Sequence, residues 1–185
     1  MNKTNPKLLI ALFVVIALAT YIKLSNPHKK FSTKQYWQSA SVNSVRDVPD
    51  AALEPGNKNG PVLMWAATTV SDPEIIKALV QRGADINESD IIFSGTPLSG
   101  AASDNNNPEI IDTLVELGAD VSQEIAFGRT ALMNAAVFNT NPDITIALLN
   151  NGANIKNKSD EGKTALDYAR EYDNERVQKV LESQN

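Results

Sequence analysis

The residues that could support catalysis or metal binding are few. The 185-residue sequence has no cysteine, which excludes disulfides, thiol nucleophiles and cysteine-ligated metals. Its only histidine, His28, lies between Pro27 and Lys29 in a polar connector, a setting typical of a solvated linker residue rather than of a metal ligand or a general base. The sequence also lacks a zinc-protease motif, a glycine-rich phosphate-binding loop and a usable Ser-His-Asp arrangement. We therefore expect no enzyme, with no catalytic residue, no cofactor and no metal site.

The charges are unevenly distributed along the chain. Residues 1–34 contain six lysines and no acidic residue, so the remainder holds 11 of the 17 basic residues and all 22 acidic ones, a formal net charge of −11. An acidic surface repels phosphate backbones, and we therefore expect no nucleic-acid partner. Hydrophobic residues make up 42% of the sequence and charged residues 21%, proportions typical of a folded domain rather than of a disordered chain.

An apolar segment of fifteen residues, Leu8–Ile22, lies near the N-terminus between Lys7 and Lys23. A secretory signal peptide has a basic start, an apolar run of about 7–15 residues and a small-x-small cleavage site, which Ala17-Leu18-Ala19 would supply. A membrane-spanning helix needs about 17–25 apolar residues, and Lys23 could lengthen this one by reaching toward the membrane surface. Lysines on both sides leave the orientation of a membrane helix unset. We predict a signal peptide or a transmembrane anchor over residues 1–24, with a cleaved signal slightly favoured, and a basic linker over 25–31.

Two sequence patterns recur with one period along the rest of the chain. The first is a leucine preceded by small residues and followed in most copies by paired alanines. Its leucines are spaced by 35, 34 and 34 residues and are Leu63, Leu98, Leu132 and Leu166. The second is an Asp-Pro or Asn-Pro pair followed by an acid and an apolar run. Its prolines are spaced by 35 and 34 residues and are Pro73, Pro108 and Pro142. Two independent patterns that share a period indicate a structural repeat.

The second pattern has the features of a capped amphipathic helix. In its first copy Asp72 can accept a backbone N–H as the N-cap, and Pro73 occupies the first helical position, where no N–H is needed. Glu74 then places negative charge at the positive end of the helix dipole, and Gly83 can end the helix in a left-handed conformation. The later copies repeat these features with Asn107, Asn141, Gly118 and Gly152. The first pattern predicts a shorter helix in each repeat, whose paired alanines allow a neighbouring helix to approach closely.

The combined pattern resembles the ankyrin repeat over about residues 60–185. This resemblance implies an all-α fold, an ankyrin-repeat solenoid of four to five helix-turn-helix repeats with hairpin loops. The sequence departs from the family in two ways. Its period is 34–35 rather than about 33 residues. The histidine that usually follows the leucine is also replaced, so its hydrogen bonds must be made by other groups or lost. The replacing residues are Met64, Ser99, Met133 and Asp167.

The repeats predict the internal boundaries of a domain over residues 32–185. A degenerate first repeat spans about 32–59, with apolar bulk from Phe31, Tyr36 and Trp37 and a second helix containing Val45 that ends at Pro49. Complete repeats follow over about 60–94, 95–128 and 129–162. Residues 163–185 form a C-terminal cap, whose last helix has a polar outer face that keeps the end of the stack soluble.

The resemblance also implies where a partner would bind. Ankyrin proteins use the hairpin tips and the exposed side of the first helices, which together line a concave surface. The two middle repeats carry apolar and aromatic residues at these positions, where polar residues are usual, and an apolar patch with charge beside it is typical of a binding hot spot. The candidate partner-binding residues are Ile92, Phe93, Phe127, Arg129, Val137 and Phe138. The alternative is that these side chains fold back and cover the hairpins.

These features predict a protein–protein interaction module that binds another protein through the concave hairpin and inner-helix surface. The Asn-Pro-acid connectors resemble those of bacterial ankyrin proteins, and the N-terminal segment predicts a periplasmic or inner-membrane-anchored location. Within the cell envelope, an immunity or inhibitor protein and an adaptor are both consistent with the sequence. We expect a monomer, in contact with the membrane if the N-terminal segment is retained. A structural membrane-proximal spacer with no dedicated ligand is the alternative.

Overall fold

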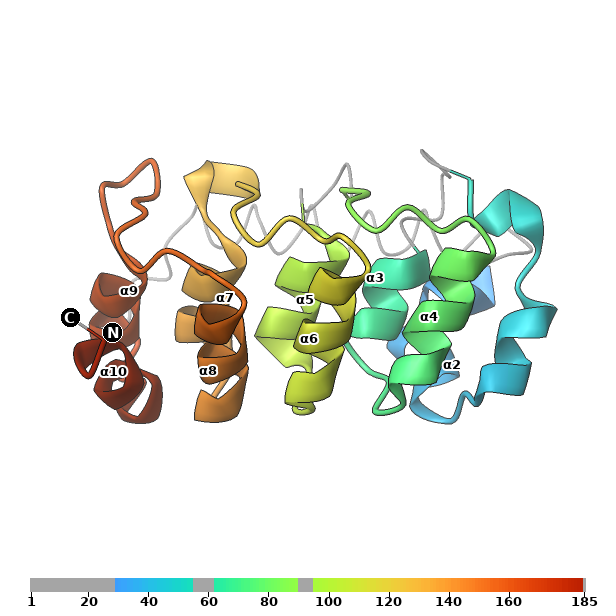
Figure 1. Cartoon of the computed structure of the whole chain (residues 1–185), viewed down its shortest axis with the longest axis horizontal. Helices are drawn as coiled ribbons and strands as arrows, with labels where there is room; N and C mark the ends of the chain where they lie inside the picture. Colours follow the sequence, from blue (N-terminus) through green and yellow to red (C-terminus); the bar gives the residue numbers. More distant parts are fainter. Residues whose placement is uncertain (1–28, 55–61, 90–94, 185) are drawn as a thin grey trace, which may run out of the picture.

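Pairs of antiparallel helices stack side by side in the computed structural model, which describes residues 29–54, 62–89 and 95–184 (Figure 1). One row contains α3 (Val62–Ala67), α5 (Pro97–Asp104), α7 (Ala131–Phe138) and α9 (Ala165–Glu171). The second row contains α4 (Pro73–Gln81), α6 (Pro108–Glu116), α8 (Pro142–Asn150) and α10 (Glu175–Glu182). Each helix contacts its pair mate and the equivalent helices of the adjacent repeats. The arrangement confirms the predicted all-α repeat solenoid.

The connecting hairpins project from one end of the helices, along the top of Figure 1. We call the row from α3 to α9 the inner helices and the row from α4 to α10 the outer helices. The hairpin before α7 contains a short 3-10 helix, η4 (Ala126–Gly128). The predicted signal peptide or anchor, residues 1–24, lies outside the described residues. Within the described ranges, every helix is too short or too polar to cross a membrane.

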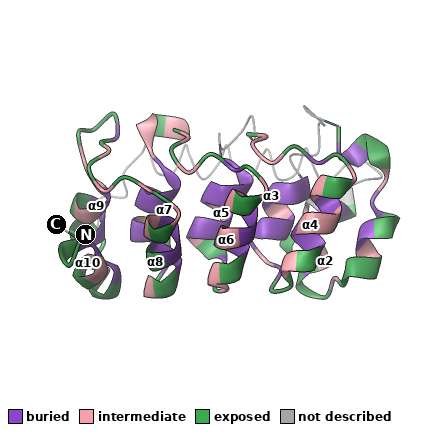
Figure 2. Ribbon diagram, viewed as in Figure 1, coloured by how far each residue is buried: buried purple, intermediate pink, exposed green. Residues whose placement is uncertain are grey.

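The hydrophobic core runs continuously along the stack. The inner helices α3, α5 and α7 are mostly purple in Figure 2, whereas the outer helices are buried on one face only. The repeat leucines Leu63, Leu98 and Leu132 are each 1% exposed. The paired alanines are fully buried at the contacts between inner helices, as the close approach predicted from their small size requires. They are Ala66, Ala67, Ala101, Ala102, Ala135 and Ala136.

The predicted helix caps are confirmed. Asp72 Oδ1 accepts from Glu74 N at 3.0 Å, and the equivalent bonds from Glu109 N to Asn107 Oδ1 and from Asp143 N to Asn141 Oδ1 are both 3.1 Å. The outer helices end before glycines with positive φ, at 97° for Gly83, 99° for Gly118 and 90° for Gly152. These local signals set the length of the outer helices, because a proline can begin a helix and a left-handed residue ends it.

Two of the residues that replace the ankyrin histidine cap inner helices. The Ser99 hydroxyl accepts from Thr96 N at 2.8 Å, and Asp167 Oδ2 accepts from Thr164 N at 2.9 Å. In both cases the threonine hydroxyl accepts a bond in return, which completes a capping box. Hydrogen bonds to the backbone and side chain of Thr164 lower the pKa of Asp167. The histidine's role is thus filled within the inner helix at these two repeats.

Asparagines join each repeat to the one before it. The Asn105 amide donates to Ala67 O at 2.6 Å and to Val70 O at 2.9 Å. Asn139 repeats this bridge to Ala102 O and Asn105 O at 3.1 and 2.7 Å, and Asn174 repeats it to Ala136 O and Asn139 O at 3.1 and 2.8 Å. The accepting carbonyls lie at or beyond the C-terminal ends of inner helices, where the helix itself provides no donor. We refer to Asn105, Asn139 and Asn174 as the asparagine ladder.

The N-terminal region packs against the first complete repeat. It contains η1 (Lys29–Ser32), α2 (Lys34–Gln38), η2 (Val42–Asp47) and η3 (Asp50–Ala52). Helices η1 and α2 contact α3, and η2 contacts α4. Phe31 and Trp37 are 2% and 1% exposed, and Trp37 Nε1 donates to Phe31 O at 2.7 Å. The packed region therefore includes Phe31, which the predicted boundary assigns to the linker.

The element in the position of the predicted second helix, η2, is 3-10 helical. Its backbone uses tight i to i+3 hydrogen bonds, such as Val48 N to Val45 O at 3.1 Å. Pro49 lies two residues after the end of η2, so the segment is too short for further turns. Arg82, the residue that ends α4, donates to Val45 O and pairs with Asp50, which fixes this region to the next repeat.

We expect the asparagine ladder to contribute strongly to stability. Asn105→Ala would remove two hydrogen bonds and leave buried carbonyls without a donor, which should lower the free energy of unfolding by about 2–4 kcal/mol. Urea denaturation followed by circular dichroism measures this change. The adjacent Asn106→Ala is the matched control, because its side chain is exposed and forms no hydrogen bond with the described residues. That variant should stay within about 0.5 kcal/mol of the parent. Equal effects of the two substitutions would contradict the ladder's role.

Candidate functional site

A groove of about 590 Å³ lies along the inner helices. Its floor is α5, where the residues facing the groove are small and include Ser99, Gly100 and Ser103. Its walls are Trp65 on α3 and Phe138 on α7. A Cβ at Gly100 would lie 3.0 Å from Thr68 Cγ2 and 3.1 Å from Met64 Cγ, so the glycine allows α3 to approach α5 closely. The groove therefore arises because one inner helix has small residues between two that have large ones.

The six predicted contact residues do not share one environment. Phe127, Arg129 and Phe138 line the groove. Val137 is partly buried and packs against the hydrophobic core instead. Ile92 and Phe93 lie outside the described residues.

Phe127 and Phe138 are exposed to solvent. Their exposed fractions are 70% and 56%, so the alternative in which these two side chains fold back over the hairpins does not describe them. Val137 points elsewhere because it is adjacent to Phe138 on a helix, and successive helical residues face different directions.

Phe127 has a left-handed backbone conformation, with φ at 65°. This conformation is unfavourable for residues with a Cβ, and Asn, Asp or Gly are usual in it. The hairpin is held in this shape by the next one, because Asp160 N donates to Phe127 O at 3.0 Å. Gly128 is pressed against the same residue, and a Cβ there would lie 2.6 Å from Asp160 Oδ1. A strained backbone thus presents an aromatic side chain that the core does not use.

Arg129 crosses the end of the groove beside Phe138. Its guanidinium carbon lies 5.7 Å from the centre of the Phe138 ring, within the range of a cation–π contact. Its backbone is fixed by the hydrogen bond from Ile125 N to Arg129 O at 2.8 Å. The side chain is partly buried, so Arg129 is part of the groove wall rather than a charge on its rim.

Two polar atoms of groove residues are buried without a hydrogen-bond partner. Among the described residues three side-chain atoms have this property, and two of them are Arg129 Nε and Asn134 Oδ1. The third, Thr145 Oγ1, belongs to the outer helix α8. Asn134 is only 7% exposed. Buried polar groups are nearly always hydrogen-bonded, so these two groups distinguish the groove from the rest of the described surface.

The groove continues toward the next repeat. A smaller pocket of about 160 Å³ shares Phe127 and Arg129 with the groove and also includes Tyr168. Its two acids are already paired, because Lys163 Nζ lies 2.8 Å from Glu161 and 2.7 Å from Glu171. Hydrogen bonds to these two acids raise the pKa of Lys163.

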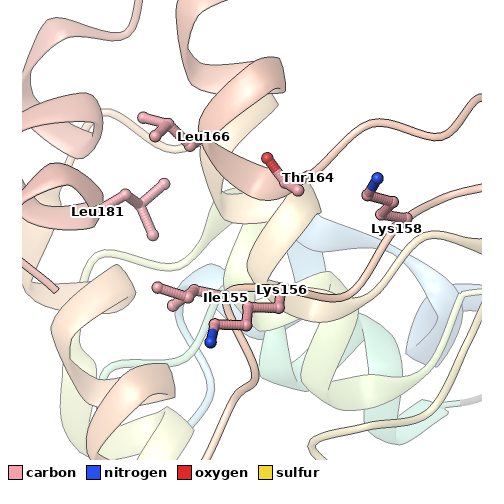
Figure 3. A pocket seen from close by; sticks show the side chains of 6 residues that line it. All are labelled: Ile155, Lys156, Lys158, Thr164, Leu166 and Leu181. Atoms are coloured by element: carbon pink, nitrogen blue, oxygen red, sulfur yellow. The ribbon is translucent and has the colours of Figure 1, made fainter. Parts of the chain in front are cut away.

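A third pocket, of about 200 Å³, lies in the C-terminal repeat, between the last hairpin and the helices α9 and α10 (Figure 3). The side chains of Ile155, Leu166 and Leu181 surround it, with Lys156 and Lys158 nearby. None of its side chains has a buried atom that lacks a partner, among the residues described. It therefore lacks the unsatisfied groups that distinguish the groove over α5.

Gly100 and Asn134 line the groove but are not among the contact residues predicted from the sequence. Both occupy the second position after the repeat leucine, where the four repeats have Trp65, Gly100, Asn134 and Tyr168. The first three of these line the groove, and Tyr168 lines the adjoining pocket. This position differs in size and polarity between repeats that are otherwise alike. This variation between repeats was the signal in the sequence for a surface position, because a position facing the core would need a similar apolar residue in every repeat.

Comparison with known protein families agrees with the repeat pattern. Residues 98–185 match the family model described as ankyrin repeats, in three copies, and residues 61–91 match the model of a single ankyrin repeat. No curated protein matches the chain. The matched ranges contain the repeat leucines, the paired alanines and the outer-helix caps. The chain belongs to the ankyrin-repeat family.

Proposed function

We propose that the groove over α5 is the surface through which this ankyrin-repeat protein binds a segment of a partner protein. Ankyrin repeats form a non-catalytic interaction fold, and the fold itself does not specify the surface used. The observation that supports this surface is the pair of exposed phenylalanines, Phe127 and Phe138, beside buried polar atoms without partners. Aromatic side chains at the centre of an interface commonly contribute much of the binding energy.

The cost of presenting Phe127 also supports a binding role. Left-handed backbone at a residue with a side chain costs about 1 kcal/mol or more, and such strain is concentrated at functional sites. A spacer between the membrane and another domain would need neither an exposed phenylalanine nor a strained hairpin. The groove therefore favours a dedicated ligand over the spacer alternative.

The site of action in this proposal is the bacterial cell envelope. The support is the sequence of residues 1–24, in which lysines precede an apolar run that contains a small-x-small site. A periplasmic or inner-membrane-anchored binding module could act as an immunity or inhibitor protein that blocks a toxic enzyme, or as an adaptor of a resident envelope protein. An immunity protein would be encoded beside a toxin-like hydrolase, so the neighbouring gene separates the two roles.

We expect Phe138→Ala to weaken binding of a partner captured from envelope extract by about 2 kcal/mol or more, roughly thirtyfold. Titration calorimetry with the purified partner measures this change. The free energy of unfolding should fall by less than about 1 kcal/mol, because the side chain is mostly exposed. Ile146→Ala is the matched control, since Ile146 is a 40% exposed apolar residue on the outer helix α8. Loss of folding by the Phe138 variant, or unchanged affinity, would contradict the proposal.

Phe127 allows strain and binding to be separated. Phe127→Gly and Phe127→Ala remove the same aromatic ring, but only glycine adopts the left-handed conformation without a steric cost. The glycine variant should therefore be more stable than the alanine variant by about 1 kcal/mol in urea denaturation. Both variants should lose affinity for the partner. If the two variants have equal stability, the hairpin of the free protein does not hold this residue in a strained state.

Export is tested by mass spectrometry of cell fractions. We expect either a mature N-terminus at Thr20, after removal of the segment that ends at Ala19, or an intact chain in the inner-membrane fraction. A full-length protein in the soluble cytoplasmic fraction would rule out both forms of the envelope proposal while leaving the groove proposal in place.

A further inference from the structure

We infer that the partner segment carries a carboxylate beside an apolar side chain, with the carboxylate paired to Arg129 and an N–H of the segment donated to Asn134. This inference rests on the proposed function, because it concerns the occupant of the same groove. It specifies a peptide with an aspartate or a glutamate within about two residues of an apolar anchor.

Arg129 lacks the ion pair that comparable residues have. Four described lysine and arginine residues are partly buried, and three of them pair with a carboxylate: Lys77 with Glu74 at 2.7 Å, Lys163 with Glu161 at 2.8 Å, and Arg82 with Asp50. Arg129 forms no ion pair with the described residues, and its Nε is buried without a partner. The N–H at Nε is cut off from water and has no acceptor, which carries a free-energy cost, and a carboxylate bound to the guanidinium would offset it.

None of the described acids around the groove is paired with Arg129. Asp104 lines the groove but pairs with Lys34 at 2.8 Å. Glu161 and Glu171 both pair with Lys163. Asp160 lies against Gly128 and forms no ion pair with Arg129. The described part of the chain therefore leaves the guanidinium without a carboxylate, and a carboxylate of a bound molecule would fit its fork geometry.

Asn134 provides the second recognition element. It lies on α7, it is 7% exposed, and its unpartnered Oδ1 can only accept a hydrogen bond. The backbone of an extended peptide presents N–H groups of this kind. Between Asn134 and the opposite wall at Trp65, the small residues of α5 leave room for an apolar side chain.

The position of Arg129 limits the spacing of these elements along the peptide. Because its guanidinium stacks on Phe138, a carboxylate bound there would lie next to the apolar wall of the groove. The acid and the apolar anchor of the peptide must therefore be near neighbours in sequence.

Because the domain is negatively charged overall, a preference for acidic peptides would be a specific sign of a local contact. Residues 35–185 carry a formal net charge of −11, so long-range electrostatics favour basic peptides. A preference for an acidic residue would run against that field and would require a local contact. At 0.15 M salt, where the Debye length is about 8 Å, a local contact outweighs distant charges.

The test is selection of peptides from a random phage-displayed dodecapeptide library on the full chain at 0.15 M salt. We expect the selected peptides to share an aspartate or a glutamate within two positions of an apolar residue. A synthetic consensus peptide whose acid is changed to Asn or Gln should bind the parent protein about tenfold more weakly, or worse, by fluorescence polarisation. No selected peptide, or a basic consensus, would overturn the inference.

Variants of the protein assign the effect to Arg129. Against Arg129→Gln, the acidic and amide peptides should bind within about twofold of each other, whereas Lys156→Gln, which removes an exposed cation elsewhere, should keep the tenfold difference. Arg129→Lys should keep part of the difference, since it retains the charge without the fork. Circular dichroism checks that each variant is folded. An acid preference that persists in Arg129→Gln would overturn the assignment.

The same peptides distinguish failure of this inference from failure of the proposed function. If Phe138→Ala binds them as tightly as the parent, the groove is not the binding surface and both proposals fail. If Phe138→Ala weakens binding but the acidic and amide peptides bind the parent equally, only the carboxylate inference fails. An N-acetylated leucine that displaces the peptide at equal concentration would indicate a small carboxylate ligand and would also overturn the inference.

Discussion

The inner helices α3, α5 and α7 end with backbone carbonyls that the helix itself cannot satisfy. The asparagine ladder satisfies these groups from the following repeat, because one amide reaches two carbonyls at once. Asn105 and Asn139 also accept a backbone N–H, from Asn107 and Asn141 respectively, at 2.9 Å in both cases. Each asparagine therefore fixes the end of one helix, the start of the next outer helix and the distance between repeats. The positions of the hairpins relative to one another, and therefore the shape of the groove, depend on the hydrogen bonds of the asparagine ladder.

Because the stack is held together by the leucines, the alanine pairs and the asparagine ladder, other positions are free to differ between repeats. The second position after the repeat leucine holds Trp65, Gly100, Asn134 and Tyr168 without disturbing the solenoid. A large, a small and a polar residue in succession make a wall, a floor and a hydrogen-bonding site on three adjacent helices. In a repeat protein each unit contacts only its neighbours, so a recognition surface of this kind can be built from single substitutions in consecutive units.

The extent to which the sequence predicts this molecule follows from how local each feature is. The caps at Asp72, Asn107 and Asn141 depend on residues two or three apart, and they occur where the pattern indicates. The groove depends on side chains from three helices separated by more than thirty residues, so neither its depth over Gly100 nor the burial of Asn134 can be read from one segment. Val137 and Phe138 are adjacent and both apolar, and only the packing of α7 decides which of them reaches solvent.

The unfavourable features of the groove are concentrated in one part of the fold. The strained backbone at Phe127, the unpaired Arg129 and the unsatisfied Asn134 all lie at one junction, between the α5 and α7 repeats. That junction is bridged by Asn139, and the contact of Asp160 with Phe127 holds the hairpin of the α7 repeat against the hairpin of the following repeat. The surrounding repeats hold these unfavourable groups in place in the free protein. Binding of a partner therefore need not order them. A ligand that satisfies the guanidinium and the amide oxygen would recover free energy that folding left unused, and it would do so only if its own groups match their positions.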